Sequence, residues 1–323
     1  MEQRGNSGCD WSAMREFVLN ATRIEDGTRP RECVYHYTRP DVLNEFLKDG
    51  GDFLCTHFRA LNDTREFLEG LDYVLGYMRR RNWHSSLIEK FIKYTYLRTQ
   101  FDWSIPWIMS FSSLNDSLYQ WRSYTDECQG GYAIGFESSA IEKFRNANLW
   151  ACNQIDRTPV SVFFSPCWYR GLENDVIEEW CEKFFSEVPQ GELVSGVLTQ
   201  GHETLLHSLA LILAMLIKNR AFYFEQEQRL ALVHNFPDAY RDVISVDGKP
   251  RMWANVPRVI GPLRDIIRSV IISPHGNRNV LYANALSLKM KYGAKYNIVF
   301  SEAPFNGDGC RSFVANPIRT AGG

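Results

Sequence analysis

Two glutamates and an arginine, Glu225, Glu227 and Arg229, occupy alternate positions within residues 222–233. Side chains alternate between the two faces of a β-strand, so a strand here places all three on one face, about 7 Å apart. Its aromatic start and apolar end would be buried. Two carboxylates beside a guanidinium form either a solvated charge cluster or an active site. A helix would point Glu225 and Glu227 about 200° apart and separate the cluster.

A Ser-x-Ser pair marks a second stretch with the alternation of a strand, residues 107–112. Ser110 and Ser112 share one face with Ile108, whereas the residues on the other face are all apolar. On a half-buried strand such hydroxyls most often bond to neighbouring backbone groups. The pair is therefore a site candidate only in combination with other strands.

Aromatic and imidazole groups follow one another in a third stretch, residues 33–38, whose composition favours a strand. Tyr35 and Tyr37 lie on one face of this strand, and His36 lies on the other. The sequence leaves open which face looks toward a site, because a shift of one residue in register exchanges the two faces.

The elements that carry these residues follow from hydrophobic periodicity and from turn signals. Further strands are expected at residues 53–58, 132–136, 160–164, 269–273 and 296–300. Helices are expected at residues 11–21, 41–48, 64–80, 87–97, 115–124, 137–148, 173–185, 192–218 and 279–291. Short strands mixed with helices predict the α+β class.

No repeat, low-complexity segment or linker-like stretch divides the chain. Residues 1–30 are expected to be a peripheral N-terminal segment. Residues 31–323 are expected to form a single α+β domain with a helical insertion at about residues 168–220. The longest apolar run, residues 205–217, is interrupted by His207 and is too short to span a bilayer, so it predicts a buried core helix.

The composition is that of a soluble globular protein without a strong charge bias. A net charge of −2 argues against a global electrostatic footprint for nucleic acid or an anionic membrane. Three consecutive arginines, residues 79–81, lie in a helical pattern and predict a solvated face. The eight cysteines form no CxxC pair and no Cys/His cluster with zinc spacing, and no apolar signal core follows Met1. We therefore expect reduced thiols, no metal, no membrane association and a cytoplasmic protein.

The order of the polar strands, an aromatic residue or histidine, then Ser-x-Ser, then Glu-x-Glu, resembles that of ADP-ribosyltransferases. The chain also resembles the bacterial domain of unknown function 2971 over about residues 33–275, and members of that family look like distant ADP-ribosyltransferases associated with phage defence. This resemblance rests on Tyr35-His36-Tyr37, on Leu61 to Phe67, on the block from Ser110 through Trp121, Tyr124 and Gly131 to Phe136, and on Phe224 to Arg229 with Lys218 upstream. Asn62 and Asp63 in the second of these segments also suit the cap of the helix that follows.

The resemblance implies an ADP-ribosyltransferase-like fold, a split mixed β-sheet core with helical insertions. It also implies cleavage of the nicotinamide–ribose bond of NAD. Because that reaction passes through an oxocarbenium ion, negative charge near the ribose stabilises its transition state. By resemblance, Glu227 binds the ribose 2′-hydroxyl and stabilises the cation, and Glu225 orients or deprotonates the acceptor.

The same resemblance implies how NAD, the substrate, would be bound without a metal. One of Tyr35, His36 and Tyr37 would hold the nicotinamide or its ribose. Ser110 and Ser112 would align Glu227 and the ribose. Arg229 would bind the diphosphate, whose geometry suits a guanidinium.

The predicted function is therefore an NAD-dependent ADP-ribosyltransferase, a toxin or phage-defence effector. It would modify a macromolecular acceptor, either protein or nucleic acid, and an antitoxin-like protein could neutralise it. An NAD glycohydrolase would use the same site with water as the acceptor. The alternative from another class is a non-catalytic nucleotide- or partner-binding module, for which Glu227→Gln leaves function intact.

Overall fold

A computed structural model of the protein describes residues 32–61, 65–101, 107–146, 160–186, 188–234, 243–246, 248–254 and 256–304. The helix expected at residues 11–21 and the helix cap expected at Asn62 or Asp63 lie outside these ranges. The five cysteines that fall within them are free thiols. Among the same residues, no helix combines the length and the apolar character needed to cross a membrane.

The polar stretches identified in the sequence lie mainly on β-strands. They are β1 (Cys33–Thr38), β2 (Leu54–His57), β3 (Trp107–Ser112), β4 (Tyr132–Glu137), β5 (Val160–Pro166), β6 (Trp168–Arg170), β7 (Ile217–Asn219), β8 (Glu227–His234), β9 (Val243–Val246), β10 (Lys249–Trp253), β11 (Ile267–Ile272) and β12 (Asn297–Phe300). The strands expected from periodicity are confirmed in outline, whereas the short strands β6, β7, β9 and β10 were not predicted.

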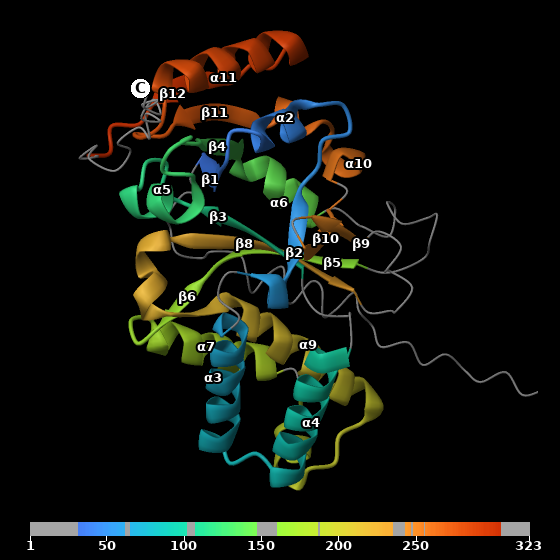
Figure 1. The fold of residues 1–323 in the computed structure, drawn as a ribbon. Coiled ribbons are helices and arrows are strands. Elements are labelled where there is room, and N and C mark those ends of the chain that lie inside the picture. The colour runs from blue at the N-terminus through green and yellow to red at the C-terminus, as the bar shows by residue number, and fades with distance from the viewer. Residues whose placement is uncertain are drawn as a thin grey trace, which may run out of the picture.

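Helices are interspersed among these strands along the chain (Figure 1). The α-helices are α2 (Val42–Leu47), α3 (Glu66–Arg80), α4 (Ser85–Phe101), α5 (Leu118–Tyr124), α6 (Ser138–Asn146), α7 (Asn174–Phe185), α8 (Gln190–Ser195), α9 (Gln200–Leu216), α10 (Val256–Ile260) and α11 (Arg278–Tyr292). Short 3₁₀-helices are η1 (Phe58–Ala60), η3 (Arg220–Glu225) and η5 (Leu263–Asp265).

Ten of the described strands form one sheet, in which β8 pairs with both β3 and β5. Apart from β5 and β8, the strands of this sheet are hydrogen-bonded in the order β12-β11-β4-β1-β3-β2-β10-β9. Every pairing in this sheet is antiparallel except that of β11 with β12. Because most of the pairing is antiparallel and the helices are interspersed, the α+β class is confirmed.

The sheet forks at β3. One edge of β3 pairs with β8 along its whole length. The other edge is shared, since β1 pairs with β3 at Ser112 whereas β2 pairs with it at Trp107 and Ile108. The carbonyl oxygen of Ser110, between these two pairing points, lies 3.0 Å from Nδ1 of the His36 ring. At the fork, the His36 side chain thus provides a hydrogen bond to the backbone carbonyl oxygen of Ser110.

Each face of the sheet packs on its own set of helices. One face, which carries Trp107, Met109 and Phe111 of β3, packs against α2, α6, α10 and α11. The other face, which carries Ile108, packs against α3, α4, α7 and α9, the group of helices at the bottom of Figure 1. The predicted alternation of β3 is therefore confirmed, and Ser110 and Ser112 belong to the second face.

The apolar run at residues 205–217 forms most of α9, and its described members, such as Leu213, are buried as predicted. Gly70 on α3 lets the two helices approach closely, because a Cβ added there would lie 2.1 Å from the carbonyl oxygen of Ala214. The chain leaves α9 directly into β7, which carries Lys218. Because α9 packs closely on α3, the position of Lys218 on the strand that follows α9 directly is fixed as well.

The arginine run at the end of α3 is exposed, as the sequence predicted. Arg80 and Arg81 form ion pairs with Glu178 and Glu182 of α7. Exposed pairs of this kind contribute little to stability.

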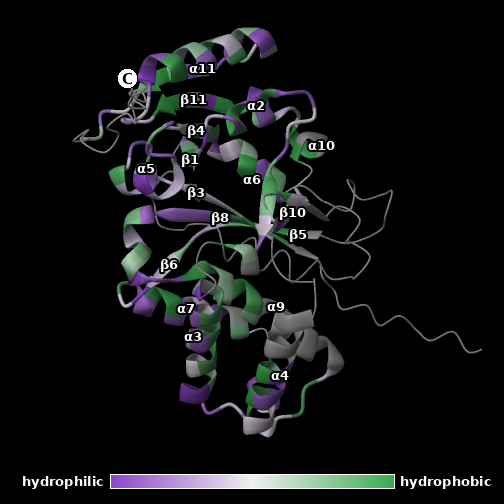
Figure 2. Ribbon diagram, viewed as in Figure 1, coloured by the Kyte–Doolittle hydropathy of each residue, from purple (hydrophilic) through white to green (hydrophobic). Residues whose placement is uncertain are grey.

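Two predicted elements differ from the structure. The helix expected at residues 192–218 is divided into α8 and α9, and its last two residues belong to β7. The second difference concerns the strand expected at residues 222–233. Residues 222–225 belong to the 3₁₀-helix η3 instead of extending β8, and the strand starts at Glu227. The aromatic start is not buried either, since Phe224 is 67% exposed and Tyr223 is 40% exposed. Figure 2 shows that the first residues of β8 are hydrophilic, although they lie within the sheet.

Candidate functional site

Three neighbouring strands place one side chain each in a row across the sheet. Tyr35 on β1 lies opposite Ser112 on β3, and Ser112 lies opposite Glu227 on β8. Ladder partners point to the same face of a sheet, so these three side chains share the face that also carries Ile108. The row brings together an aromatic residue, a serine and a glutamate that are far apart in the sequence.

His36 lies on the opposite face of β1, within the core. Its ring packs edge-to-face against Phe46 and Phe111, with ring centroids 5.9 and 6.0 Å away. Burial lowers the pKa of His36, so the imidazole is neutral at pH 7. Because a carbonyl only accepts, Nδ1 donates to the oxygen of Ser110. The structure therefore separates His36 from the row and gives it a structural contact.

Tyr37 shares the face of Tyr35 but supports a loop. Its hydroxyl donates to the carbonyl oxygen of Leu114 (2.9 Å) and accepts from the backbone nitrogen of Ser117 (2.9 Å). Ser117 caps α5, and Tyr37 thus fixes the start of that helix. Of the three candidates on β1, Tyr35 is the one in line with Ser112 and Glu227.

Glu225 reaches the site from a turn, one residue before β8 begins. Gln226 has left-handed backbone angles (φ 45°, ψ 49°), and its carbonyl oxygen accepts from the backbone nitrogen of Ser113 at 2.9 Å. This conformation is uncommon for a residue other than glycine, asparagine or aspartate. The turn still brings the carboxylate of Glu225 beside that of Glu227, because both bind the same ammonium group.

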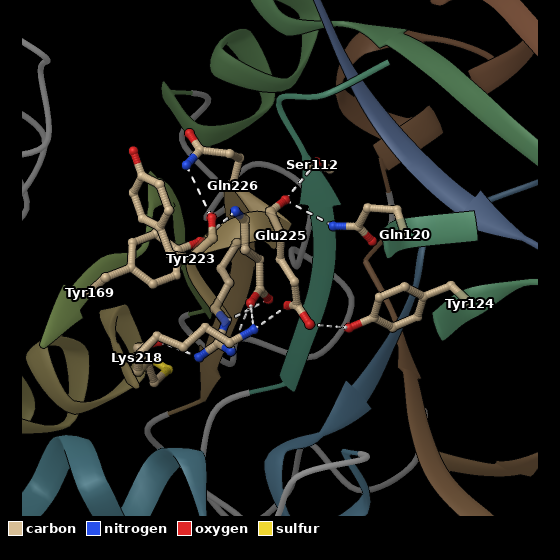
Figure 3. A network of polar contacts seen from close by, with 11 residues as sticks. Ser112, Gln120, Tyr124, Tyr169, Lys218, Tyr223, Glu225 and Gln226 are labelled. Atoms are coloured by element: carbon tan, nitrogen blue, oxygen red, sulfur yellow. Dashed lines mark hydrogen bonds and ion pairs between the residues drawn. The ribbon is translucent and has the colours of Figure 1, made fainter. Parts of the chain in front are cut away.

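That ammonium belongs to Lys218, whose Nζ contacts Oε2 of Glu225 and Oε2 of Glu227 (Figure 3). Arg229 completes the cluster, since its Nε lies 2.8 Å from Oε1 of Glu227 and its second terminal nitrogen 3.1 Å from Oε2. Its first terminal nitrogen donates to the carbonyl oxygen of Met215 at 2.5 Å. Two carboxylates and two cations therefore form one charge-balanced network.

The network is buried. Each of its four charged side chains is at most 5% exposed. The reading of these residues as a solvated charge cluster is therefore wrong. Removing such charges from water costs several kcal/mol per ion, about as much as their mutual attraction returns, so a buried network is weak evidence for a purely stabilising role. Buried, interacting ionisable groups of this kind are candidates for a functional site.

Glu227 is held in its charged form by two cations. Burial raises the pKa of its carboxyl, but the charges of Arg229 and Lys218, and their hydrogen bonds, outweigh this effect and hold the pKa well below its usual range. Glu227 is therefore ionised at neutral pH.

The backbone around both glutamates is fixed by side chains from other elements. The carbonyl oxygen of Glu225 accepts from the Ser112 hydroxyl (2.6 Å) and from Nε2 of Gln120 on α5 (2.8 Å). The backbone nitrogen of Glu227 donates to the Tyr169 hydroxyl on β6 at 2.8 Å. Burial raises the pKa of Tyr169, so this hydroxyl stays protonated. Ser112 thus supports the turn instead of contacting a carboxylate.

The other predicted residues lie close to this network. Ser110, which is partly exposed, lies opposite Arg229 in the β3–β8 ladder. The guanidinium of Arg229 turns inward to Glu227 and Met215 and is 2% exposed. The predicted pairing of Arg229 with a diphosphate would require its release from these partners.

Sequence reasoning missed Tyr169, Gln120 and Tyr124 as members of the network. Tyr124 donates from its hydroxyl to Oε1 of Glu225 at 3.2 Å. Tyr169 is placed by the parallel pairing of β6 with β7, in which it lies opposite Lys218. A three-residue strand has no periodicity to reveal it. Gln120 and Tyr124 stand four residues apart on α5, a spacing that could have suggested a shared helix face.

No group of three or more histidine, cysteine, aspartate or glutamate side chains suited to holding a metal ion occurs among the residues that the structure describes.

A family model described as a protein of unknown function (DUF2971) matches residues 120–230. This supports the resemblance to that family seen in the sequence. The matched range contains most of the network, namely Gln120, Tyr124, Tyr169, Lys218, Glu225, Glu227 and Arg229. Tyr35 and Ser112 lie outside it. No curated protein and no solved structure matches the chain.

Proposed function

We propose that the protein is an NAD-dependent ADP-ribosyltransferase that uses the site around Glu227. The observation that carries this proposal is the row of Tyr35, Ser112 and Glu227 across β1, β3 and β8. It joins, on adjacent strands beside the fork of the sheet, the aromatic, serine and glutamate positions whose order resembles that of ADP-ribosyltransferases. Glu225 adds a second carboxylate next to the first.

In this reaction the bond between C1′ of the ribose and the nicotinamide nitrogen breaks, and its electrons leave with nicotinamide. The ionised Glu227 stabilises the resulting oxocarbenium ion and binds the 2′-hydroxyl. Glu225 accepts a proton from the acceptor, a group of a protein or nucleic acid, while the acceptor's lone pair forms the new bond to C1′. Tyr35 holds the nicotinamide or its ribose, and Ser110 borders the site.

The ion network sets a condition on this chemistry. Both oxygens of Glu227 already accept hydrogen bonds from Arg229 and Lys218. Because the Glu227 side chain is also only 4% exposed, the ribose gains access to it only after the side chains that cover it move. Glu225 contacts Lys218 through one carboxylate oxygen and the neutral Tyr124 hydroxyl through the other.

The ion pairs of Glu225 and Glu227 also favour a second candidate function from another class, that of a non-catalytic binding module. Carboxylates that are fully paired and buried can serve to hold η3 and β8 together. In that case the site would be a structural support beneath a nucleotide- or partner-binding surface.

The deciding experiment measures nicotinamide release from labelled NAD by the purified protein, with and without cell extract, and follows the label into macromolecules. Glu227→Gln is compared with Glu137→Gln, a matched change at a more exposed glutamate that pairs with Arg268 at the surface. Urea unfolding of both variants shows whether each protein is folded at the assay temperature.

Label on a macromolecule that disappears in Glu227→Gln and persists in Glu137→Gln supports the transferase and identifies the acceptor class. Release without transfer identifies an NAD glycohydrolase at the same site. The absence of turnover and of NAD binding in the folded wild-type protein would overturn the enzyme proposal and favour the binding module.

A further inference from the structure

Helix α5 holds Glu225 at two points (Figure 3). Gln120 donates from Nε2 to the backbone carbonyl oxygen of Glu225 at 2.8 Å, and Tyr124 donates from its hydroxyl to the carboxylate at 3.2 Å. These two residues are one turn apart on the same side of the helix. One helix face thus fixes both the main chain and the side chain of a single glutamate.

Tyr124 differs from the other partners in its exposure. Lys218, Arg229, Ser112, Gln120 and Tyr169 are all buried. Tyr124, by contrast, is partly exposed. The contact between Tyr124 and Glu225 is therefore a point at which the charged network approaches solvent.

The position of α5 is itself fixed from outside the network. The carboxylate of Asp116 accepts from Nε1 of Trp121 on α5 (2.7 Å) and from the Ser301 hydroxyl beyond β12 (2.5 Å). At the other end of the helix, the Thr125 hydroxyl lies 2.8 Å from Nε2 of His275. Residues from the far end of the chain thus hold α5, so the Tyr124 hydroxyl is presented to Glu225 by a rigid support.

The aromatic ring of Tyr124 also lies near the row. Tyr124 and Tyr35 both pack against the cluster formed by Tyr37, Trp121, Ala133 and Ile271. Tyr124, which bonds to Glu225, thus shares a packing cluster with the residue proposed to hold the substrate.

We propose that Tyr124 is a positioning residue that orients the Glu225 carboxylate toward the acceptor at the exposed end of the network. This inference rests on the proposed transferase function. In the step concerned, the acceptor O–H or N–H gives its proton to Glu225 and its lone pair bonds to C1′, while nicotinamide leaves with the electrons of the broken bond. Tyr124 exchanges no atom with the substrate. It fixes the oxygen that receives the proton.

Tyr124→Phe removes one hydroxyl and keeps the ring. The matched control is Tyr119→Phe on the same helix, where the side chain is 37% exposed. We expect kcat for transfer to fall about tenfold in Tyr124→Phe, with KM for NAD changed less than about twofold, because an oriented hydrogen bond is lost without removal of an NAD contact. The control should match the wild type.

A readout that is independent of activity separates this inference from the proposed function. In protein labelled with ¹³C at glutamate carboxyl groups, the Glu225 signal, assigned from the spectrum of Glu225→Gln, should shift at pH 7 in Tyr124→Phe and stay in place in Tyr119→Phe. A wild-type protein that fails to cleave NAD would overturn the transferase proposal, and with it the role of Tyr124 in transfer, even where the signal shifts. An active wild type with an unchanged Glu225 signal, or a shifted signal with unchanged kcat, would overturn the role of Tyr124 alone.

Discussion

The hydroxyl of Tyr169 accepts a hydrogen bond from the backbone nitrogen of Glu227 at 2.8 Å, across 58 residues of sequence. In the β6–β7 pair, Tyr169 also lies opposite Lys218. The small two-stranded sheet therefore fixes both the lysine and the first residue of β8. This connection joins the helical layer below the sheet to the carboxylates of the candidate site.

Tyr169→Phe should destabilise the protein by about 1–3 kcal/mol, because it leaves the buried N–H of Glu227 without its acceptor. The change in the free energy of unfolding is measured by urea titration. Tyr282→Phe, at a hydroxyl on the exposed side of α11, is the control and should change stability by less than about 0.5 kcal/mol. Equal stability of the two variants would contradict the role assigned to Tyr169.

The charge balance of the network predicts strong coupling between Lys218 and Glu225. Lys218→Met leaves two buried carboxylates with one guanidinium and should cost about 3–5 kcal/mol. Adding Glu225→Gln restores neutrality, so the double variant should be more stable than the sum of the single effects predicts. Urea unfolding of the four proteins in this cycle measures the coupling. Additive effects would show that the two side chains do not act as one unit.

The sequence predicted β1, β3, β4 and the apolar helix α9, because strand-favouring composition, alternation of side chains or a long, mostly apolar run marks each of them. It also placed Ser112 and Glu227 on strands, and the structure shows that these two strands pair. It could not predict that η3 interrupts the strand at Glu225, because Gln226 is not a residue type that signals a left-handed turn. Burial of the charges could not be predicted either, since alternation is the same for a solvated face and for a face that Lys218 neutralises from β7, outside the main sheet.

His36 should make stability depend on pH. Its folded-state pKa is lowered by burial, so the unfolded state binds a proton that the folded state excludes. The stabilising contribution is present above the ordinary histidine pKa of about 6.5 and is lost as the pH falls below it. Burial also lowers the pKa of His275, so that residue adds a contribution of the same sign.

Unfolding free energies measured between pH 7.5 and 5.5 test the role of His36. His36→Asn keeps a donor for the Ser110 carbonyl and removes the titration, so its stability should decrease less on acidification than that of the wild type. His84→Asn, at an exposed histidine, should follow the wild-type curve. A His36→Asn curve with the wild-type slope would contradict the assignment.

Gly135 on β4 should be required for the position of Tyr35. It lies opposite Tyr35 in the β1–β4 ladder, and a Cβ added there would lie 2.8 Å from Cε1 of Tyr35 and 2.4 Å from the Ser269 hydroxyl. Gly135→Ala should therefore cost about 1–3 kcal/mol through overpacking, measured by urea unfolding. Gly191→Ala in α8, where an added Cβ meets nothing within 4 Å, is the control and should not destabilise the protein.

A second substitution separates the two contacts of that Cβ. Gly135→Ala combined with Ser269→Ala removes the closer contact and should recover part of the stability, while the contact with Tyr35 remains. If Tyr35 holds the nicotinamide or its ribose, NAD turnover should stay low in the double variant although its stability rises. Recovery of turnover in parallel with stability would show that the tyrosine ring contributes to folding alone, and that the row across β1, β3 and β8 begins at Ser112.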